Sequence, residues 1–167
     1  MKGISQSAES NGPAIRFAVP ADADALAELR YALRASTGIA TEPKAEFLER
    51  CTVWMREHLA GDRRWQCWVA EEKGSLIAAV WVQLIEKIPN PVAELEKHAY
   101  LTSFYVKESA RSRGLGSRLL AEVIGWCKSQ DVHSIILWPT ERSRTLYQRN
   151  GFAARDDIME LIVNSSE

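Results

Sequence analysis

The sequence has few of the residues that hold small secreted or metal-binding domains together. Its 167 residues include only three cysteines and three histidines. No two of the cysteines are spaced as a CxxC pair. An odd number of scattered cysteines predicts neither a disulfide framework nor a structural zinc site. We therefore expect reduced thiols, no bound metal and a cytoplasmic protein.

Long apolar runs and an excess of one charge are also missing. The longest apolar run, residues 76–82, is far shorter than the ~20 residues that span a bilayer. The 21 Lys and Arg residues nearly balance the 22 Asp and Glu residues, which leaves a formal net charge of −1. Such a balance argues against binding to nucleic acid by bulk charge. The sequence therefore predicts no membrane span and no nucleic-acid partner.

The rest of the composition is that of an ordinary globular protein, with 46% hydrophobic and 26% charged residues. This length predicts one domain with its own core. Residues 1–13 are polar and small and lack the apolar centre of a signal peptide, so we expect a disordered lead-in there. The single domain is expected to occupy residues 14–167.

Apolar periodicity predicts a chain of mixed α/β class. Neighbouring strands early in the chain predict an antiparallel start, whereas a strand–helix–strand unit around residue 115 predicts a parallel crossover. The strands are expected at residues 14–19, 65–71, 76–88, 98–106, 133–138 and within 152–163, and the helices at about 22–35, 43–61, 115–129 and 143–149.

A glycine loop, Arg111-Ser-Arg-Gly-Leu-Gly-Ser-Arg118, lies between a predicted strand and a predicted helix. Free N–H groups at a helix N-terminus attract phosphate, and glycine lets a ligand approach the backbone closely. The loop is not a P-loop, because Gly116 is not followed by Lys and then Ser or Thr. It is not a dinucleotide fingerprint either, because Leu119 stands where the third glycine belongs. From these residues alone, a solvated helix cap is as good an interpretation as a phosphate site.

Together with its flanks, this loop resembles that of the GNAT family of acetyl-CoA-dependent N-acyltransferases. Residues 111–116 match the family's Arg/Gln-x-x-Gly-x-Gly/Ala loop, residues 104–106 match the strand before it, and residues 146–152 match its Leu-Tyr-x-x-x-Gly-Phe ending. The resemblance implies the GNAT fold, a mixed sheet of six to seven strands with helices on both faces. In that fold the fourth and fifth strands splay apart.

The same resemblance implies the activity. It implies an N-acetyltransferase that moves an acetyl group from acetyl-CoA to a primary amine of a small molecule, peptide or protein, by direct attack in a ternary complex. The alternative is a non-catalytic acyl-CoA-binding module that keeps the fold. A homodimer, the acceptor's identity and the use of other acyl groups are left open.

The resemblance also implies which residues hold acetyl-CoA. Pantetheine is expected between the splayed strands, with a backbone N–H of Phe104 or Tyr105 holding the thioester carbonyl. The N–H groups of the glycine loop are expected to bind the pyrophosphate, helped by Arg111 or Arg113. Thr140 stands where many members carry a cofactor-binding Asn. The full set is Phe104, Tyr105, Val106, Arg111, Ser112, Arg113, Gly114, Leu115, Gly116, Ser117, Thr140 and Ser143.

Two side chains are the candidates for proton transfer. Tyr147 matches the family tyrosine that often donates a proton to the departing thiolate, and simple packing is its alternative role. Glu86, near the end of a predicted strand, is chosen as the general base. Glu94, Glu96, His98, Tyr100 and Ser103 are the other candidates for the base. All three cysteines are expected to be packed, which favours direct attack over a cysteine nucleophile.

The acceptor is expected to be selected by the first two helices and the loop between residues 85 and 100. Glu42, Glu46, Glu94 and Glu96 favour a cationic amine, unless they are only solvated charges. Trp54, Trp65, Trp68 and Trp81 favour an aromatic pocket, unless they only pack the core. Residues 107–149 hold eight Lys or Arg and four Asp or Glu, a net +4 that would attract an anionic cofactor.

Overall fold

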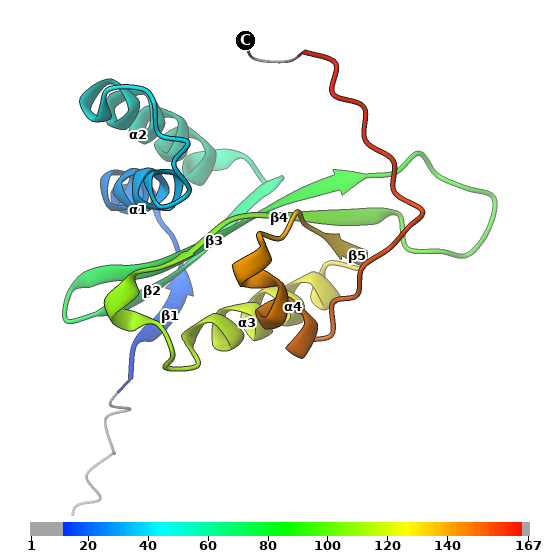
Figure 1. Ribbon diagram of the computed structural model, residues 1–167. Helices are drawn as coiled ribbons and strands as arrows, with labels where there is room; N and C mark the ends of the chain where they lie inside the picture. The colour runs from blue at the N-terminus through cyan, green and yellow to red at the C-terminus, as the bar shows by residue number, and fades with distance from the viewer. Residues whose placement is uncertain (1–11, 165–167) are drawn as a thin grey trace, which may run out of the picture.

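The structure, a computed structural model, describes residues 12–164 (Figure 1). Most of the predicted lead-in, residues 1–11, lies outside the described residues, as do residues 165–167. No helix in the described part of the chain is long and apolar enough to cross a membrane. The elements are β1 (Ala14–Phe17), η1 (Pro20–Asp22), α1 (Ala23–Ala35), α2 (Lys44–Gly61), β2 (Trp65–Glu72), β3 (Ser75–Glu86), β4 (Lys97–Val106), η2 (Glu108–Ala110), α3 (Leu115–Ser129), β5 (Val132–Ile136), η3 (Glu141–Ser143) and α4 (Arg144–Arg149).

The strands form one sheet in the order β1-β2-β3-β4-β5. Neighbours from β1 to β4 are antiparallel, and β5 runs parallel to β4. Helices α1 and α2 cover one face of the sheet, and α3 and α4 cover the other (Figure 1). This confirms the expected mixed α/β fold with helices on both faces, with five strands in residues 12–164 rather than six to seven.

The predicted strand within residues 152–163 is the main error. After α4, residues 150–164 do not join the sheet (Figure 1). Its side chains Ile158, Leu161 and Val163 are 58%, 84% and 79% exposed. Apolar, β-branched composition suggested a strand, but a strand needs a neighbour for its backbone N–H and C=O groups. This segment has no such neighbour among the described residues.

The central strand β3 divides the core into two layers. Val80 and Val82 pack with α3, whereas Trp81 packs with α1 and α2. All three are at most 2% exposed. Successive side chains of a strand point to opposite faces, so a strand that is covered on both faces is apolar along its whole length. This explains the apolar run at residues 76–82.

Local sequence explains how the flanking elements begin and end. The β2–β3 hairpin turns at Lys73 and Gly74, whose φ angles are 51° and 74°. Positive φ at both central positions is typical of the two-residue hairpin turn that was expected there. Helix α3 buries one apolar face, at the i, i+4, i+5 and i+8 spacing of Leu115, Leu119, Leu120 and Val123.

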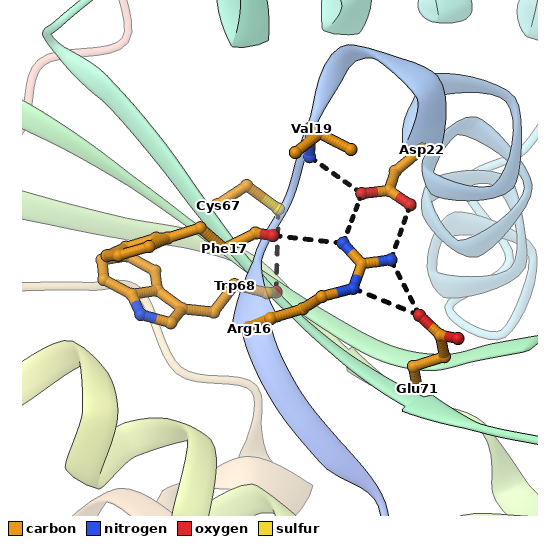
Figure 2. Close-up of polar contacts among 7 residues, drawn as sticks. All are labelled: Arg16, Phe17, Val19, Asp22, Cys67, Trp68 and Glu71. Atoms are coloured by element: carbon orange, nitrogen blue, oxygen red, sulfur yellow. Dashed lines mark hydrogen bonds and ion pairs between the residues drawn. The ribbon is translucent and has the colours of Figure 1, made fainter. Parts of the chain in front are cut away.

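An ion-pair network around Arg16 ties β1 to its neighbours (Figure 2). The guanidinium donates to both carboxylate oxygens of Asp22, at 2.8 and 3.0 Å, and to Glu71 on β2 at 2.8 and 3.1 Å. Asp22 also accepts the backbone N–H of Val19 at 2.8 Å. The bond from Arg16 is the main reason that the pKa of Asp22 lies below its usual value. The network thus joins β1, η1 and β2 at the start of α1.

Candidate active site

Strands β4 and β5 part halfway along β4. Their parallel pairing runs only from Lys97, opposite Val132, to Tyr100, opposite Ile136. Residues 101–106 of β4 pair with β3 on one side and with no described strand on the other. The expected splay therefore lies directly before the glycine loop, and it leaves an open backbone edge there.

A β-bulge lies in this open stretch of β4. Thr102 pairs with Trp81 and Tyr105 pairs with Ala79, so two β4 residues stand opposite one β3 residue. Ser103 has a φ of 51°, a strained left-handed conformation for a residue with a Cβ. Such a bulge redirects the chain and leaves backbone groups unpaired.

The bulge also changes which residues face which layer. Before it, Tyr100 and Thr102 face the cavity beside α1 and α2. From the second bulge residue onward, Phe104 and Val106 pack with α3, and Tyr105 packs with the α1 layer. The family resemblance implies a role for the N–H of Phe104 or Tyr105, but the sequence holds no signal for a bulge at a serine.

The glycine loop leads into α3 with its N–H groups free. Gly114 is the N-cap, with a φ of 72° that suits glycine. Within the described residues, no acceptor bonds the backbone N–H groups of residues 112–117. The first such bond of the helix joins the Arg118 N–H to the Gly114 carbonyl at 3.1 Å. Residues 112–114 are exposed, so an anion can reach these donors.

Gly116 is needed for a different reason, close packing. A Cβ at this position would lie 3.2 Å from Leu146 Cδ2 and 3.8 Å from Phe104 Cζ. The first turn of α3 therefore lies against α4 and β4. The structure thus brings together three predicted segments, residues 104–106, 111–117 and 146–152.

The two loop arginines have protein partners. Arg111 donates from Nε to the Val106 carbonyl at 3.0 Å and lies over the Tyr105 ring at 5.6 Å. Arg113 pairs with Glu72 at 2.6 Å. Arg111 therefore braces the end of β4 beside the loop, whereas Arg113 is directed toward β2.

Tyr147 lies in α4 beside the open edge of β4. Its ring is 7% exposed and packs on Phe104 and Phe152, with centroid distances of 6.3 and 5.5 Å. Burial raises the pKa of the phenol to about 12. Its hydroxyl has no bonded partner among the described residues, yet it is not among the fully buried unpartnered atoms. A phenol in this setting keeps its proton at neutral pH and can still donate it.

Thr140 and Ser143 bond to each other. The Thr140 hydroxyl donates to Ser143 Oγ at 3.0 Å and accepts the Ser143 N–H at 3.3 Å. This contact caps η3 before α4. Ser117 is bonded too, because its hydroxyl accepts from Asn150 at 3.1 Å. The Ser117 hydroxyl thus helps to hold the end of α4 against α3. Cofactor contacts from Thr140 and Ser143 stay a prediction.

The structure does not bring Glu86 to this site. Glu86 is exposed at the far end of β3, where it lies opposite Lys97 in the sheet register. It is five residues from Trp81, about 17 Å along a strand. By alternation it also points to the α3 face, opposite to Trp81. The sequence does not show which face of β3 borders the cavity, so the position of Glu86 near a strand end was a poor guide to its role.

Of the other candidates for the general base, some line a cavity beside the bulge and others lie elsewhere. Tyr100 and Ser103 line the cavity described below. Glu94 pairs with Lys87 at 2.8 Å on the β3–β4 loop. His98 bonds the Ser134 hydroxyl at 2.7 Å, two residues before Tyr100 on β4.

A cavity of about 390 Å³ lies between helices α1 and α2 and strands β2 to β4. Trp54, Trp65 and Trp81 line it, as the aromatic-pocket interpretation required, whereas Trp68 packs on the opposite face of the sheet. None of the acidic residues proposed for a cationic amine lines it. Arg30 and Cys51 also line the cavity and were not predicted. No sequence motif marks either of them.

A second cavity, of about 440 Å³, lies between β1 and α3. It is larger, but none of the residues that line it belongs to β4, the glycine loop or α4. The smaller cavity adjoins the bulge through Thr102 and Ser103. It is therefore the better candidate for an acceptor pocket.

Comparison with known proteins agrees with the family resemblance seen in the sequence. The model of the Acetyltransferase (GNAT) family matches residues 31–152. A search of curated proteins found no match.

Many solved structures have the same fold. One is a predicted acetyltransferase from Clostridium acetobutylicum solved with acetyl-CoA, at 24% identity and a TM-score of 0.77 over 90% of this chain and 96% of that one. Another is a GCN5-related N-acetyltransferase from Ralstonia eutropha, at 25% identity and a TM-score of 0.76 over 92% and 100%. Glucosamine-6-phosphate N-acetyltransferase from Arabidopsis thaliana is 20% identical, with a TM-score of 0.67 over 91% and 99%.

Proposed function

Because this chain belongs to the GNAT acetyltransferase family, we propose that it moves an acetyl group from acetyl-CoA to a primary amine by direct attack in a ternary complex. The observation that carries the proposal is the free row of N–H groups at residues 112–117 beside the unpaired edge of β4. The free N–H groups can donate hydrogen bonds to a pyrophosphate. The unpaired backbone edge of β4 can form hydrogen bonds with the amides of pantetheine.

These residues fit acetyl-CoA chemically. The N-terminus of α3 combines free donors with the positive end of the helix dipole, which favours an anion. Arg111 adds a positive charge at the end of β4. When bound, acetyl-CoA supplies the acetyl thioester. Near the bulge, the N–H of Phe104 or Tyr105 is the donor for its carbonyl oxygen, and a donor of this kind contributes a few kcal/mol where water is excluded.

Tyr147 is the proposed general acid. Its ring is held by Phe104 on one side and Phe152 on the other. With its pKa raised to about 12 it remains protonated throughout the neutral range, so it is ready to protonate a departing thiolate.

The proton of the amine leaves by another route. No Asp, Glu or His lines the acceptor cavity in the described residues. We therefore assign proton removal to water, with Tyr100 and Ser103 as the polar groups beside it. Cys51 also lies there, but burial raises the pKa of its thiol, which disfavours a cysteine nucleophile. With no protein base, kcat/KM should rise with pH as the acceptor amine loses its proton.

Two measurements test the proposal. Acetyl-CoA should raise the melting temperature, whereas ATP and NAD should not. Thiol release from acetyl-CoA should then depend on an added amine from a broad panel. A melting shift without thiol release from any amine would instead favour a non-catalytic acyl-CoA-binding module. The absence of any shift would refute both functions.

A further inference from the structure

The acceptor cavity has an aromatic wall. Trp54, Trp65 and Trp81 contact one another, with ring centroids 5.2 to 6.1 Å apart. Phe47 and Tyr100 also line the cavity. Indole faces bury a flat apolar group well and give specific stacking geometry. The wall therefore suits an acceptor with an aromatic or large apolar body.

The cavity also has an uncompensated positive charge. Arg30, on α1, is half-buried and lines the cavity. Among residues 12–164, no carboxylate forms an ion pair with it, whereas the neighbouring Arg50 pairs with Glu42. Burial lowers the pKa of Arg30, and the positive charge of Arg34 lowers it further, whereas Cys51 and Tyr100 act in the opposite direction. A half-buried guanidinium without a counter-ion is a binding group for an anion.

These two features lie next to the reacting end of the site. Thr102 and Ser103 line the cavity and directly precede Phe104 and Tyr105 on β4. A molecule in the cavity therefore has one end at the bulge, where the reaction is proposed to occur. Its other end lies among Arg30 and the indoles.

We propose that the acceptor is an aromatic amino acid or a close analogue, whose carboxylate binds Arg30 and whose ring packs on Trp54 and Trp65, with the buried Trp81 behind them. This rests on the proposed acetyl transfer, and it names the substrate class. The same charge disfavours polyamines and other polycations, because no carboxylate lines the cavity among residues 12–164.

The test uses acceptors that differ only in the carboxylate. Thiol release is measured for L-tryptophan against tryptamine and for L-phenylalanine against 2-phenylethylamine, at equal concentrations of free base. We expect kcat/KM for the acids to be at least about tenfold higher, the effect of a charge-assisted hydrogen bond. L-Alanine should be poor, because it lacks the ring.

Variants identify the residue. Arg30→Gln should remove the preference for the acid and leave the melting shift with acetyl-CoA intact. Arg34→Gln is the matched control, since Arg34 is one turn away on α1 and does not line the cavity. It should keep the preference. Equal loss of preference in both variants would show a general field effect and overturn the role of Arg30.

A binding measurement separates this inference from the enzyme activity. Calorimetry should detect L-tryptophan binding to the wild type and not to Arg30→Gln, even if no acetyl transfer occurs. Acetylation of spermidine or glucosamine 6-phosphate, with neither binding nor turnover of aromatic acids, would overturn the inference and leave the proposed function standing. If aromatic acids neither bind nor react, the inference is wrong whatever else is found.

Discussion

The rings of Phe104 and Tyr147 lie with their centroids 6.3 Å apart and their planes tilted by 58°. Phe104 is the second residue of the β4 bulge. Tyr147 lies on α4, which packs against the first turn of α3 through Leu146. This contact connects the strand edge proposed for the thioester to the proposed acid. The acid is therefore positioned by the same packing that shapes the cofactor site.

The role of Tyr147 can be tested by removing only its hydroxyl. Tyr147→Phe keeps the ring contacts, so melting temperature and acetyl-CoA affinity should change little. We expect kcat to fall about 100-fold, as for loss of a general acid. Tyr31→Phe is a matched control, since Tyr31 packs on Phe47 outside the reacting end. An unchanged kcat in Tyr147→Phe would leave Tyr147 with a packing role only.

The raised pKa of Tyr147 predicts how stability depends on pH. Its pKa is about 12 in the folded chain and about 10 when unfolded. Below pH 10 both states hold the proton, so Tyr147 adds no pH dependence. Above pH 10 the unfolded state loses its proton first, and the free energy of unfolding falls as pH rises.

At pH 11 this loss is about 1.4 kcal/mol, equal to one pKa unit. Urea unfolding of the wild type and of Tyr147→Phe at pH 9 and pH 11 measures it. Between pH 9 and pH 11, the free energy of unfolding of the wild type should fall by about 1.4 kcal/mol more than that of Tyr147→Phe. Equal decreases in both proteins would contradict the burial of the phenol.

Two glycines of α3 provide a matched pair. A Cβ at Gly125 meets nothing within 4 Å, so Gly125→Ala should stabilise the fold by about 0.5–1 kcal/mol through helix propensity. A Cβ at Gly116 meets Leu146 at 3.2 Å, so Gly116→Ala should give no such gain. It should also weaken acetyl-CoA binding, because Leu146 must shift beside Tyr147. Thermal melts with and without acetyl-CoA compare the two variants, and equal behaviour would show that Gly116 is not constrained.

The Arg16 network should be sensitive to acid. The hydrogen bond from Arg16 lowers the pKa of Asp22, so its contribution to stability is present above pH 3.8 and is lost as pH falls toward the folded pKa. Because Arg16 is partly exposed, we expect Asp22→Asn to cost only about 1 kcal/mol at pH 7. That cost should shrink below pH 3.8. In contrast, Asp24→Asn should change little, since Asp24 is highly exposed and lies 3.5 Å from Arg56.

Local patterns were sufficient for much of the fold. The hairpin at Lys73 and Gly74, the apolar strand β3 and the face of α3 all follow from spacing within a few residues. Alternation on β2 already separates Trp65 from Trp68, because residues three apart on a strand face opposite sides. Residues 152–163 show the limit, since composition cannot supply the partner that a strand requires.

The sequence by itself determined the family, the glycine loop at the start of α3 and the candidate acid Tyr147, because each rests on residues that are close together in the chain. Only the tertiary structure decided the acceptor pocket. Arg30, Trp54, Trp81 and Thr102 come from separate elements, and they meet because the sheet register and the helix packing bring them together. The structure also decided against Glu86. Alternation puts Glu86 and Trp81 on opposite faces of β3, and only the packing of α1 and α2 on the Trp81 face shows which face holds the cavity.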